Sequence, residues 1–390
     1  MVTGATFEAD CPIGRTGMME LADGRLMAVC DSPPGSGVVG KNYSENDGRS
    51  WKSEAQLTDA AGKTFEGVGY GVLRLASGKI LACYRRVIEI PRDRDEHGLF
   101  CCWSEDDGQT WSSEQVRINR PGLSGRPYYD TMFQLESGRL IQPVRYCLQA
   151  KHPETTERGH SWIPEIDVSY VYYSDDEGKS WGRSEQDLVV WDLPGHRGSI
   201  FPCDEPSAAE AGDGSIVMAI RTTIGRVAIS RSFDEGVNWS MVEASDLMSS
   251  YSPSRIRTIP QTGDLLMVFN QVSLSENMDG YRRSRLSSAV SKDNGKTWGH
   301  FRTIECCAAL ESVDRVATEP VQFTQAGSTR GDKPLPAGPV VFRYANVNFL
   351  KGKAYVHYNY QTKLGPDNES KTDKKRKLLV VPIEWFYEKP

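Results

Sequence analysis

The sequence predicts an all-β protein, a six-bladed β-propeller that occupies residues 1–390 as a single domain. Three observations predict it. A short polar phrase ending in tryptophan recurs five times, and a hairpin-like phrase recurs six times. Helical periodicity is hard to find, and no linker divides the chain. Self-similarity at a nearly fixed spacing indicates a fold assembled from repeats.

The polar phrase has the pattern Ser-x-Asn/Asp-x-Gly-x-Ser/Thr/Asn-Trp. Its tryptophans are separated by 60, 70, 58 and 59 residues. This spacing is too long for a helical or leucine-rich repeat, but it fits a four-stranded propeller blade with long loops. The five copies are YSENDGRSW from Tyr43, WSEDDGQTW from Trp103, YSDDEGKSW from Tyr173, SRSFDEGVNW from Ser230 and VSKDNGKTW from Val290.

Each phrase reads as a tight turn. Its acidic or amide side chain can accept hydrogen bonds from backbone N–H groups two residues further on, and its glycine supplies a positive φ. The tryptophan ring can then bury a large area beneath the loop. We therefore expect five turns of the same shape, one in each of five blades.

The second recurring phrase is an apolar strand, a glycine turn and another apolar strand, as in a β-hairpin. Six hairpins and five polar turns imply six blades, the last completed by strands near the two chain ends. The hairpins are LADGRLMAV from Leu21, LASGKILACY from Leu75, LESGRLIQPV from Leu135, AGDGSIVMAI from Ala211, PQTGDLLMVF from Pro260 and LKGKAYVHY from Leu350.

The composition excludes several classes of protein. A formal charge of −6 argues against a nucleic-acid binder that depends on a basic face. No apolar run is long enough to span a membrane, and no signal peptide is visible, so we expect a cytoplasmic monomer. The nine cysteines have no zinc-ligand spacing, and no metal or cofactor motif is present.

One face of the predicted propeller collects the functional groups. Loops that lead into each innermost strand emerge beside loops that leave the second strand, around the central axis. Arginine forks bind carboxylates in a bidentate manner, so this face predicts a pocket for an anionic ligand. The side chains expected there are Arg15, Glu66, Tyr70, Arg126, Asp130, Asp204, Glu205, Arg221, Tyr251, Arg283 and Tyr344.

The polar turns resemble the Asp-boxes of the sialidase superfamily, and the resemblance covers nearly the whole chain. Sialidases hold the substrate carboxylate with three arginines, and they use a tyrosine nucleophile activated by a glutamate. The resemblance implies Arg15 in GRTGMMELADGRLMAV as the first arginine, although this phrase lacks the Ile-Pro of the family. It implies Arg283 in YRRSRLSSAVSKDNGKTW as the third, with Arg282 as the alternative register.

The match is better on the other side of the predicted pocket. DEPSAAEAGDGSIVMAIRTTIGR places Glu205 as the base and Arg221 as the second arginine, and RYANVNFLKGKAYVHY places Tyr344 as the nucleophile. A neutral tyrosine avoids the repulsion that a carboxylate nucleophile would meet beside the substrate carboxylate. We also expect Tyr251 and Arg126 to contact the substrate.

The general acid is the point of departure from the family. Sialidases carry it well inside the loop that follows the second strand of blade 1. Here that loop is DSPPGSGVVGKN, whose carboxylate is Asp31, at its very beginning. The candidates are therefore Asp31, then Asp130, then Glu66.

The resemblance implies a retaining exo-glycosidase that needs no cofactor and releases a terminal acidic sugar, most simply α-linked sialic acid, from a glycan. One alternative keeps the propeller but is a glycosidase or lyase that acts on another acidic sugar, a uronate or a deaminated sialic acid. The other is a propeller that binds acidic glycans without turnover, which the displaced general acid favours.

Overall fold

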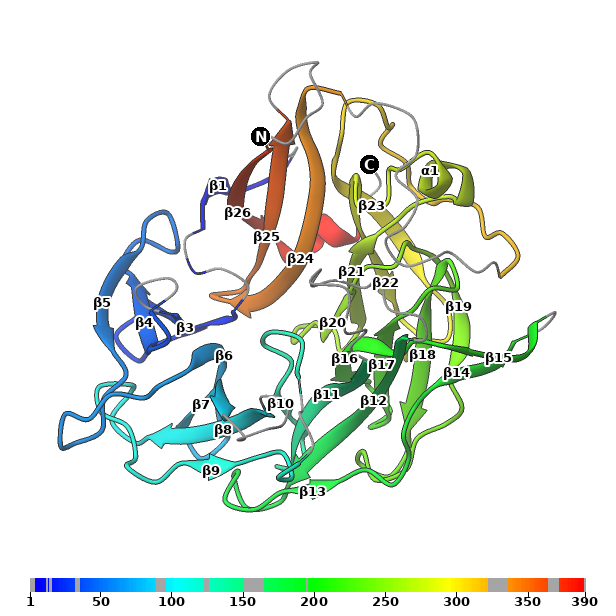
Figure 1. The fold of residues 1–390 in the computed structure, drawn as a ribbon. Coiled ribbons are helices and arrows are strands. Elements are labelled where there is room, and N and C mark those ends of the chain that lie inside the picture. The colour runs from blue at the N-terminus through cyan, green and yellow to red at the C-terminus, as the bar shows by residue number, and fades with distance from the viewer. Residues whose placement is uncertain are drawn as a thin grey trace, which may run out of the picture.

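Six four-stranded antiparallel sheets surround a central axis in the part of the chain that the computed structural model describes (Figure 1). The predicted six-bladed all-β propeller is confirmed. The described residues are 4–11, 13, 16–31, 36–88, 96–122, 126–149, 165–193, 196–321, 336–363 and 372–388.

The strands of each blade follow one another outward from the axis. Blade 1 contains β2 (Met18–Glu20), β3 (Leu26–Asp31), β4 (Val39–Ser44) and β5 (Lys52–Gln56). Blade 2 contains β6 (Val68–Arg74), β7 (Ile80–Ile88), β8 (Glu96–Ser104) and β9 (Val116–Arg117). Blade 3 contains β10 (Phe133–Gln134), β11 (Leu140–Gln149), β12 (Glu165–Ser174) and β13 (Gly182–Arg183).

The second half of the chain repeats this order. Blade 4 contains β16 (Asp204–Glu210), β17 (Ile216–Arg221), β18 (Arg226–Ser232) and β19 (Glu243–Met248). Blade 5 contains β20 (Arg255–Thr258), β21 (Leu265–Asn270), β22 (Arg285–Ser291) and β23 (Gly299–Cys306). Blade 6 contains β24 (Gly338–Leu350), β25 (Lys353–Lys363), β26 (Thr372–Pro382) and β1 (Phe7–Asp10).

Blade 6 closes the ring with strands from both ends of the chain. Strand β1 pairs antiparallel with β26, in a register that places Phe7 opposite Val380. This is the closure that the hairpin count predicts. It leaves the N-terminal strand on the outer edge of the last blade, beside blade 1 (Figure 1).

The five tryptophan-terminated phrases fold into nearly identical turns. In blade 3, the Ser174 hydroxyl donates to Asp176 at 2.8 Å and accepts from the Gly178 N–H at 2.8 Å. Asp176 accepts from the Ser180 N–H at 2.8 Å, so the acidic side chain bridges four residues rather than the two expected. The Trp181 indole donates to the Gly178 carbonyl at 2.9 Å. We call these turns boxes 1 to 5.

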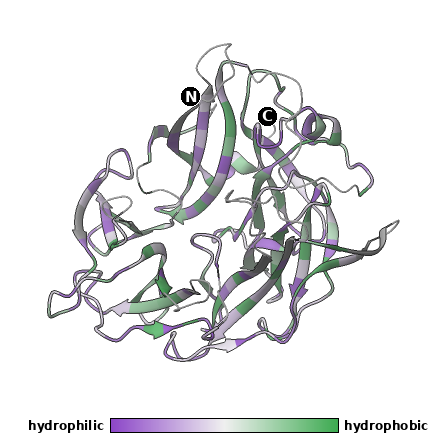
Figure 2. Cartoon of the chain, viewed as in Figure 1, coloured by the Kyte–Doolittle hydropathy of each residue, from purple (hydrophilic) through white to green (hydrophobic). Residues whose placement is uncertain are grey.

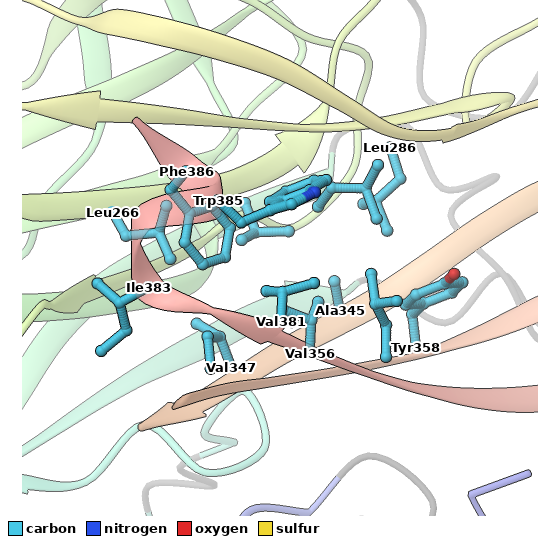
Figure 3. Close-up of a cluster of buried hydrophobic side chains, with 14 of the residues drawn as sticks. Leu266, Leu286, Ala345, Val347, Val356, Tyr358, Val381, Ile383, Trp385 and Phe386 are labelled. Atoms are coloured by element: carbon cyan, nitrogen blue, oxygen red, sulfur yellow. The ribbon is translucent and has the colours of Figure 1, made fainter. Parts of the chain in front are cut away.

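The hydrophobic core is divided among the interfaces between neighbouring blades, and the hydrophobic segments follow the blade strands (Figure 2). Six clusters of buried side chains join blade 1 to 2, 2 to 3, 3 to 4, 4 to 5, 5 to 6 and 6 back to 1. Figure 3 shows the cluster between blades 5 and 6, where the 3₁₀ turn η1 (Ile383–Phe386) contributes Ile383, Trp385 and Phe386. Each blade is thus stabilised by packing on both of its faces.

Several features add to the predicted pattern. Strands β14 (Val190–Leu193) and β15 (His196–Phe201) form a separate two-stranded arm between blades 3 and 4, and α1 (Leu274–Met278) is a single capped turn in blade 5. The eight cysteines whose side chains are described are free, and all but Cys306 are buried. Within the described residues, no helix is long and apolar enough to cross a membrane.

Candidate functional site

Three of the predicted site residues have left-handed backbone conformations, within or just before the innermost strands of their blades. The φ angles are 38° at Glu205, 57° at Tyr344 and 54° at Asp130. Glu205 and Tyr344 each lie at a break in strand register, in β16 and β24. A bulge changes the direction in which a side chain points, and a strained residue costs about 1–3 kcal/mol.

Arg221, at the end of β17, lies against the Glu205 carboxylate. The two side chains form an ion pair, and the Arg221 side chain is only 2% exposed. The arginine at the end of the second strand of blade 4 therefore meets the second residue of the first strand. Burial alone would lower the pKa of Arg221, but Glu205 and then Asp204 raise it well above its ordinary value.

Asp204 connects this pair to two other side chains. One carboxylate oxygen lies 3.3 Å from Arg221 and accepts a hydrogen bond from the Tyr251 hydroxyl at 3.1 Å. The other oxygen lies 2.8 Å from Arg145. The Tyr251 ring also lies beneath the Arg221 guanidinium, at 3.8 Å. Tyr251 is thus brought to the predicted site.

Arg145 was not singled out from the sequence. It lies on β11 of blade 3 and ion-pairs with both Asp167 and Asp204. A signal was present, because Arg145 leaves the second strand of its blade much as Arg221 leaves that of the next blade. Burial would lower the pKa of Arg145, but the charges of Asp204, Glu205 and Asp167 raise it.

Arg283 brings a second, partly buried guanidinium to Tyr344. It lies 5.5 Å from the centre of the Tyr344 ring and donates to the Tyr251 carbonyl at 3.1 Å. Burial, followed by the positive charge of Arg221, lowers the pKa of Arg283, while Tyr344 and Glu205 oppose that shift. Arg221, Arg283, Tyr344 and Glu205 are therefore within electrostatic range of one another, and two guanidiniums side by side favour an anion between them.

A second tyrosine supports the bulge that carries Tyr344. The rings of Tyr128 and Tyr344 lie 6.1 Å apart, and the Tyr128 hydroxyl donates to the Ala345 carbonyl at 3.0 Å. The Arg255 guanidinium lies 4.4 Å from the centre of the Tyr128 ring. Burial lowers the pKa of Arg255 to about 10, and the neighbouring Arg257 adds to this shift.

Asp130 lies at the hub of the propeller, and its carboxylate is heavily engaged. One oxygen accepts hydrogen bonds from Arg257 at 2.8 Å, Asn346 at 2.9 Å and Asn348 at 3.1 Å. The residue is 7% exposed. All three donors thus converge on a single oxygen of this carboxylate. Its contacts join blade 3 to blades 5 and 6.

Glycines of blades 1 and 2 leave the space that Asp130 occupies. A Cβ atom on Gly17 would lie 2.0 Å from the Asp130 carboxyl carbon, and a Cβ on Gly71 would lie 3.0 Å from one of its oxygens. The inner strands of these two blades can approach the axis only because both positions lack a side chain. The Asp130 carboxylate thus also lies against blades 1 and 2.

Arg126 is exposed at the margin of the same face. Its guanidinium contacts the Nε2 atom of His97, and its backbone pairs with that of Arg145. Burial, with further contributions from Arg126 and Arg85, lowers the pKa of His97 to about 4. Nearby, Tyr70 stacks on Tyr129 with the ring centres 4.4 Å apart.

The blade 1 side of the predicted site is less completely described. Arg15 lies outside the described residues. Asp31 ends β3 with its backbone opposite Val39, but its side chain is not among those described. Glu66 forms a backbone bridge with Val38 and is exposed. Among the described residues, no three side chains are grouped as metal ligands.

The fold and its five boxes define a class, the Asp-box β-propellers with an arginine-lined face around the axis. The family model described as a BNR repeat-like domain matches residues 42–312. The chain belongs to this family, as the resemblance predicts. No curated protein sequence matches the chain.

Solved structures with the same fold include a protein of unknown function from Dyadobacter fermentans, with a TM-score of 0.57, 15% identity and coverage of 97% of this chain and 100% of the other. They also include a Trypanosoma rangeli sialidase in complex with 2,3-difluorosialic acid as a covalent intermediate, with a TM-score of 0.54 and 13% identity. That alignment covers 99% of this chain but only 60% of the sialidase.

A Penicillium chrysogenum α-L-arabinanase complexed with arabinobiose is similar in fold as well. Its TM-score is 0.51 and its identity is 13%, and the alignment covers 98% of this chain and 95% of the arabinanase. At these identities the likeness concerns the fold alone. The chemistry has to be argued from the side chains.

Proposed function

We propose that this protein is a retaining exo-glycosidase that releases a terminal acidic sugar, most simply α-linked sialic acid, from a glycan. One observation carries the proposal. Tyr344 and Glu205 lie at two separate left-handed bulges, on blades 6 and 4, and meet around the buried guanidinium of Arg221 and the partly buried one of Arg283. A structural role for any one of these residues would not require all four to converge.

The contacts support a separate catalytic role for each of these residues. Arg221 and Arg283, together with Arg15, bind the sugar carboxylate. In the free protein Arg221 pairs with Glu205. When the substrate carboxylate competes for Arg221, that pair loosens and Glu205 can accept a proton from Tyr344. The Tyr344 oxygen then attacks the anomeric carbon as the bond to the leaving oxygen breaks, and water later releases the sugar with the same anomeric configuration.

The general acid is assigned to Asp31. Asp130, the second candidate from the sequence, has its carboxylate engaged by Arg257, Asn346 and Asn348, so it is poorly placed to contact a leaving oxygen. We assign Asp130 a structural role at the hub. Asp31 ends β3 on the same face as the segments that lead into the inner strands.

Covalent labelling with 2,3-difluorosialic acid tests the nucleophile. We expect the wild-type protein to gain the mass of one sugar on the peptide that contains Tyr344, and Tyr344→Phe to gain none. Tyr387→Phe is the matched control, because it removes a tyrosine hydroxyl that contacts Asp264 at 2.7 Å, near the C-terminus. Labelling elsewhere, or rapid turnover of an aryl α-sialoside by Tyr344→Phe, would exclude Tyr344 as the nucleophile.

The choice of sugar needs a separate assay. A panel of aryl glycosides of sialic acid, deaminated sialic acid, glucuronic acid and arabinose separates the substrates that an arginine-lined pocket could accept. We expect the acidic sugars to be turned over and the neutral arabinoside to be inert. Preferred turnover of the arabinoside would contradict the carboxylate-binding role of Arg221 and Arg283.

Leaving groups of different basicity test Asp31. A general acid matters most when the departing oxygen is strongly basic. We expect Asp31→Asn to lose about 100-fold or more in kcat/KM with a sialyl disaccharide, and far less with an aryl sialoside. The same loss with both substrates would remove Asp31 from this role and leave Glu66 as the next candidate.

A non-catalytic acidic-glycan receptor is the second candidate. The observation that favours it is the Glu205–Arg221 ion pair, because this contact occupies the carboxylate that should activate Tyr344. Saturable binding of a sialyl disaccharide by calorimetry, with neither product release nor labelling of Tyr344 after prolonged incubation, would support it over the enzyme.

A further inference from the structure

A groove of about 430 Å³ lies between box 2 and box 3, on the face opposite the candidate site. Its position follows from topology, because the boxes and the glycine turns lie at the opposite end of each blade from the segments that lead into the inner strands. The volume is within the range of small-molecule sites. Among the residues that line the groove are Lys79, Trp103, Glu105, Glu114, Glu177 and Lys179.

Trp103 is fixed in one orientation at this groove. Its indole N–H donates to the Glu177 carbonyl of the next blade at 2.7 Å, and its backbone N–H donates to the Ser112 hydroxyl at 3.1 Å. Its side chain is partly exposed. An aromatic ring that is already immobilised loses little conformational entropy when a ligand stacks on it.

Neighbouring blades cover the corresponding ring with a cation. The residue before the box serine is Tyr43 in blade 1 and Tyr173 in blade 3. Arg25 lies 4.8 Å from the centre of the Tyr43 ring, and Arg139 lies 4.7 Å from that of Tyr173. Both arginines follow the glycine turn of their own blade.

Blade 2 has lysine at that position, and the lysine makes different contacts. Lys79 lies 3.3 Å from Glu105 and 3.3 Å from Glu177. Among the described residues, no cation lies over the Trp103 ring. Blade 2 thus has the largest aromatic ring at this position, and its lysine pairs with two glutamates instead of covering that ring.

Box 2 departs from its relatives in a second respect. The tryptophan that closes boxes 1, 3 and 4 donates its indole N–H to the glycine carbonyl of its own box, at 3.1, 2.9 and 3.0 Å. In box 2 the Gly108 carbonyl instead accepts from the Lys41 ammonium at 2.7 Å. The indole nitrogen of Trp111, a residue that also lines the groove, is buried without a hydrogen-bond partner. Box 5 shares the occupied carbonyl, because Gly295 there accepts from Arg231 at 2.6 Å, so the uncovered Trp103 ring and the buried, unpaired Trp111 indole are what set box 2 apart among the described residues.

The polar lining selects the class of ligand. Three carboxylates and two ammonium groups give the groove a nearly balanced charge, so a strongly charged ligand would meet repulsion from one set or the other. The same groups are strong hydrogen-bond acceptors and donors for hydroxyl groups. We propose that this groove binds a neutral, hydroxyl-rich saccharide, with one sugar ring stacked on Trp103 and its hydroxyls bonded to Glu114 and Lys179.

This site is independent of the proposed glycosidase activity, and its test does not use that activity. The full-length protein carrying 5-fluorotryptophan is titrated with lactose, maltose and cellobiose and followed by ¹⁹F NMR. The Trp103 signal is assigned from the spectrum of Trp103→Phe. We expect that signal to shift saturably at millimolar concentrations of at least one disaccharide, and glucuronic acid at the same concentration to shift it at least fivefold less.

Two substitutions test the details, with binding followed by calorimetry. Trp103→Leu should weaken binding at least tenfold, whereas Tyr173→Leu, the same change at the cation-covered ring of blade 3, should leave it unaltered. Lys79→Arg restores the residue that covers the ring in blades 1 and 3, so it should block binding in a protein that remains fully folded by circular dichroism.

Three outcomes would overturn the proposal. The first is that none of the three disaccharides shifts the Trp103 signal saturably. The second is that glucuronic acid shifts this signal as strongly as the disaccharides do. The third is that Trp103→Leu and Lys79→Arg both bind with unchanged affinity.

Discussion

The two faces of the propeller use the same backbone conformation for different purposes. On the box face, the residue before each box glycine has a φ between 56° and 60°. On the opposite face, Asp130, Glu205 and Tyr344 have φ angles of 54°, 38° and 57°. The first set recurs in every box, whereas the second occurs in three blades and, among the described residues, has no non-glycine counterpart in the others. The residues before the box glycines are Asp47, Asp107, Glu177, Glu235 and Asn294.

Backbone strain that recurs in every box belongs to the architecture, whereas strain that occurs at single positions points to a function. The box residues are stabilised by the same local hydrogen bonds wherever they occur, so their conformation belongs to the turn. Glu205 and Tyr344 lie where the register of their inner strands shifts; blade 2 shifts register in the same way between Gly69 and Gly71, but without a non-glycine residue of positive φ. His300 and Lys351 also have positive φ but belong to neither set. The comparison can be tested by changing one member at a time.

The largest effect is expected at the hub. Asp130→Ala leaves Arg257, Asn346 and Asn348 without their shared acceptor, and removing one partner of a buried ion pair costs about 3–5 kcal/mol. Urea denaturation should show this loss in the free energy of unfolding. Asp175→Ala, which removes an exposed carboxylate paired with Arg139, should cost less than about 1 kcal/mol. Equal costs would contradict the structural role assigned to Asp130.

The second effect is on catalysis. Glu205→Gln removes the proposed proton acceptor but keeps the shape of the side chain, so kcat should fall about 100-fold or more. The free energy of unfolding should change much less than in Asp130→Ala. Glu235→Gln, at the equivalent backbone conformation in box 4, should keep full activity. If both variants are equally active, the unrepeated bulges do not mark the catalytic residues.

A smaller effect is expected within a box. Ser174→Ala leaves the buried Gly178 N–H without its acceptor, which costs about 1–3 kcal/mol. Thermal unfolding should detect the change, and activity at the opposite face should persist. An unaltered melting temperature would show that these hydrogen bonds do not stabilise the turn.

The boxes should also make stability depend on pH. Burial would raise the pKa of Asp176, but hydrogen bonds from the Ser180 side chain and backbone and from Ser174 outweigh it and lower the pKa. A lowered pKa adds stability above the unfolded value of about 4, and that stability is lost as pH falls through the folded value. Asp106, Asp234 and Asp293 are shifted in the same direction.

Urea midpoints measured between pH 3 and pH 6 should therefore fall at the acid end. The fall should be shallower in Asp176→Asn, which has no proton to bind there. Identical pH profiles for the two proteins would show that the Asp176 carboxylate does not contribute to the acid sensitivity.

The smallest effect is a gain. Glu235→Gly places glycine at a φ of 56°, which relieves about 1 kcal/mol of strain, and it gives up only a partly exposed contact to Arg139 at 3.7 Å. The free energy of unfolding should rise by up to about 1 kcal/mol. The same change at Glu205 should reduce activity whatever it does to stability.

The sequence predicts the fold well because each box contains its own explanation. Its serine, acidic residue, glycine and tryptophan interact within eight residues, so the turn can be inferred locally and counted. The closure of blade 6 follows from that count. The β14–β15 arm could not be predicted in this way, because it occurs once and no other blade offers a comparison.

Only some of the contacts in the candidate site can be predicted from the sequence in the same way. Arg221 and Glu205 pair across one hairpin, so their 16-residue separation already suggests contact. The contacts of Asp130 could not be foreseen, because its partners Asn346 and Asn348 lie more than 200 residues away. Local pattern contains no information about such contacts. Arg255, buried beside Tyr128, was missed for the same reason.

The pairing of β1 with β26 also determines the order of events during synthesis. Phe7 leaves the ribosome early, but its partner Val380 follows only after 373 more residues, which at typical translation rates takes roughly 20 to 75 s. Throughout that interval the first strand has an unsatisfied edge, and blade 1 lacks the neighbour that will cover it. Blades 2 to 5 can form in turn, but the circle is sealed last. We therefore expect the yield of folded protein to depend on how well this unpaired segment is kept from aggregating until its partner is made.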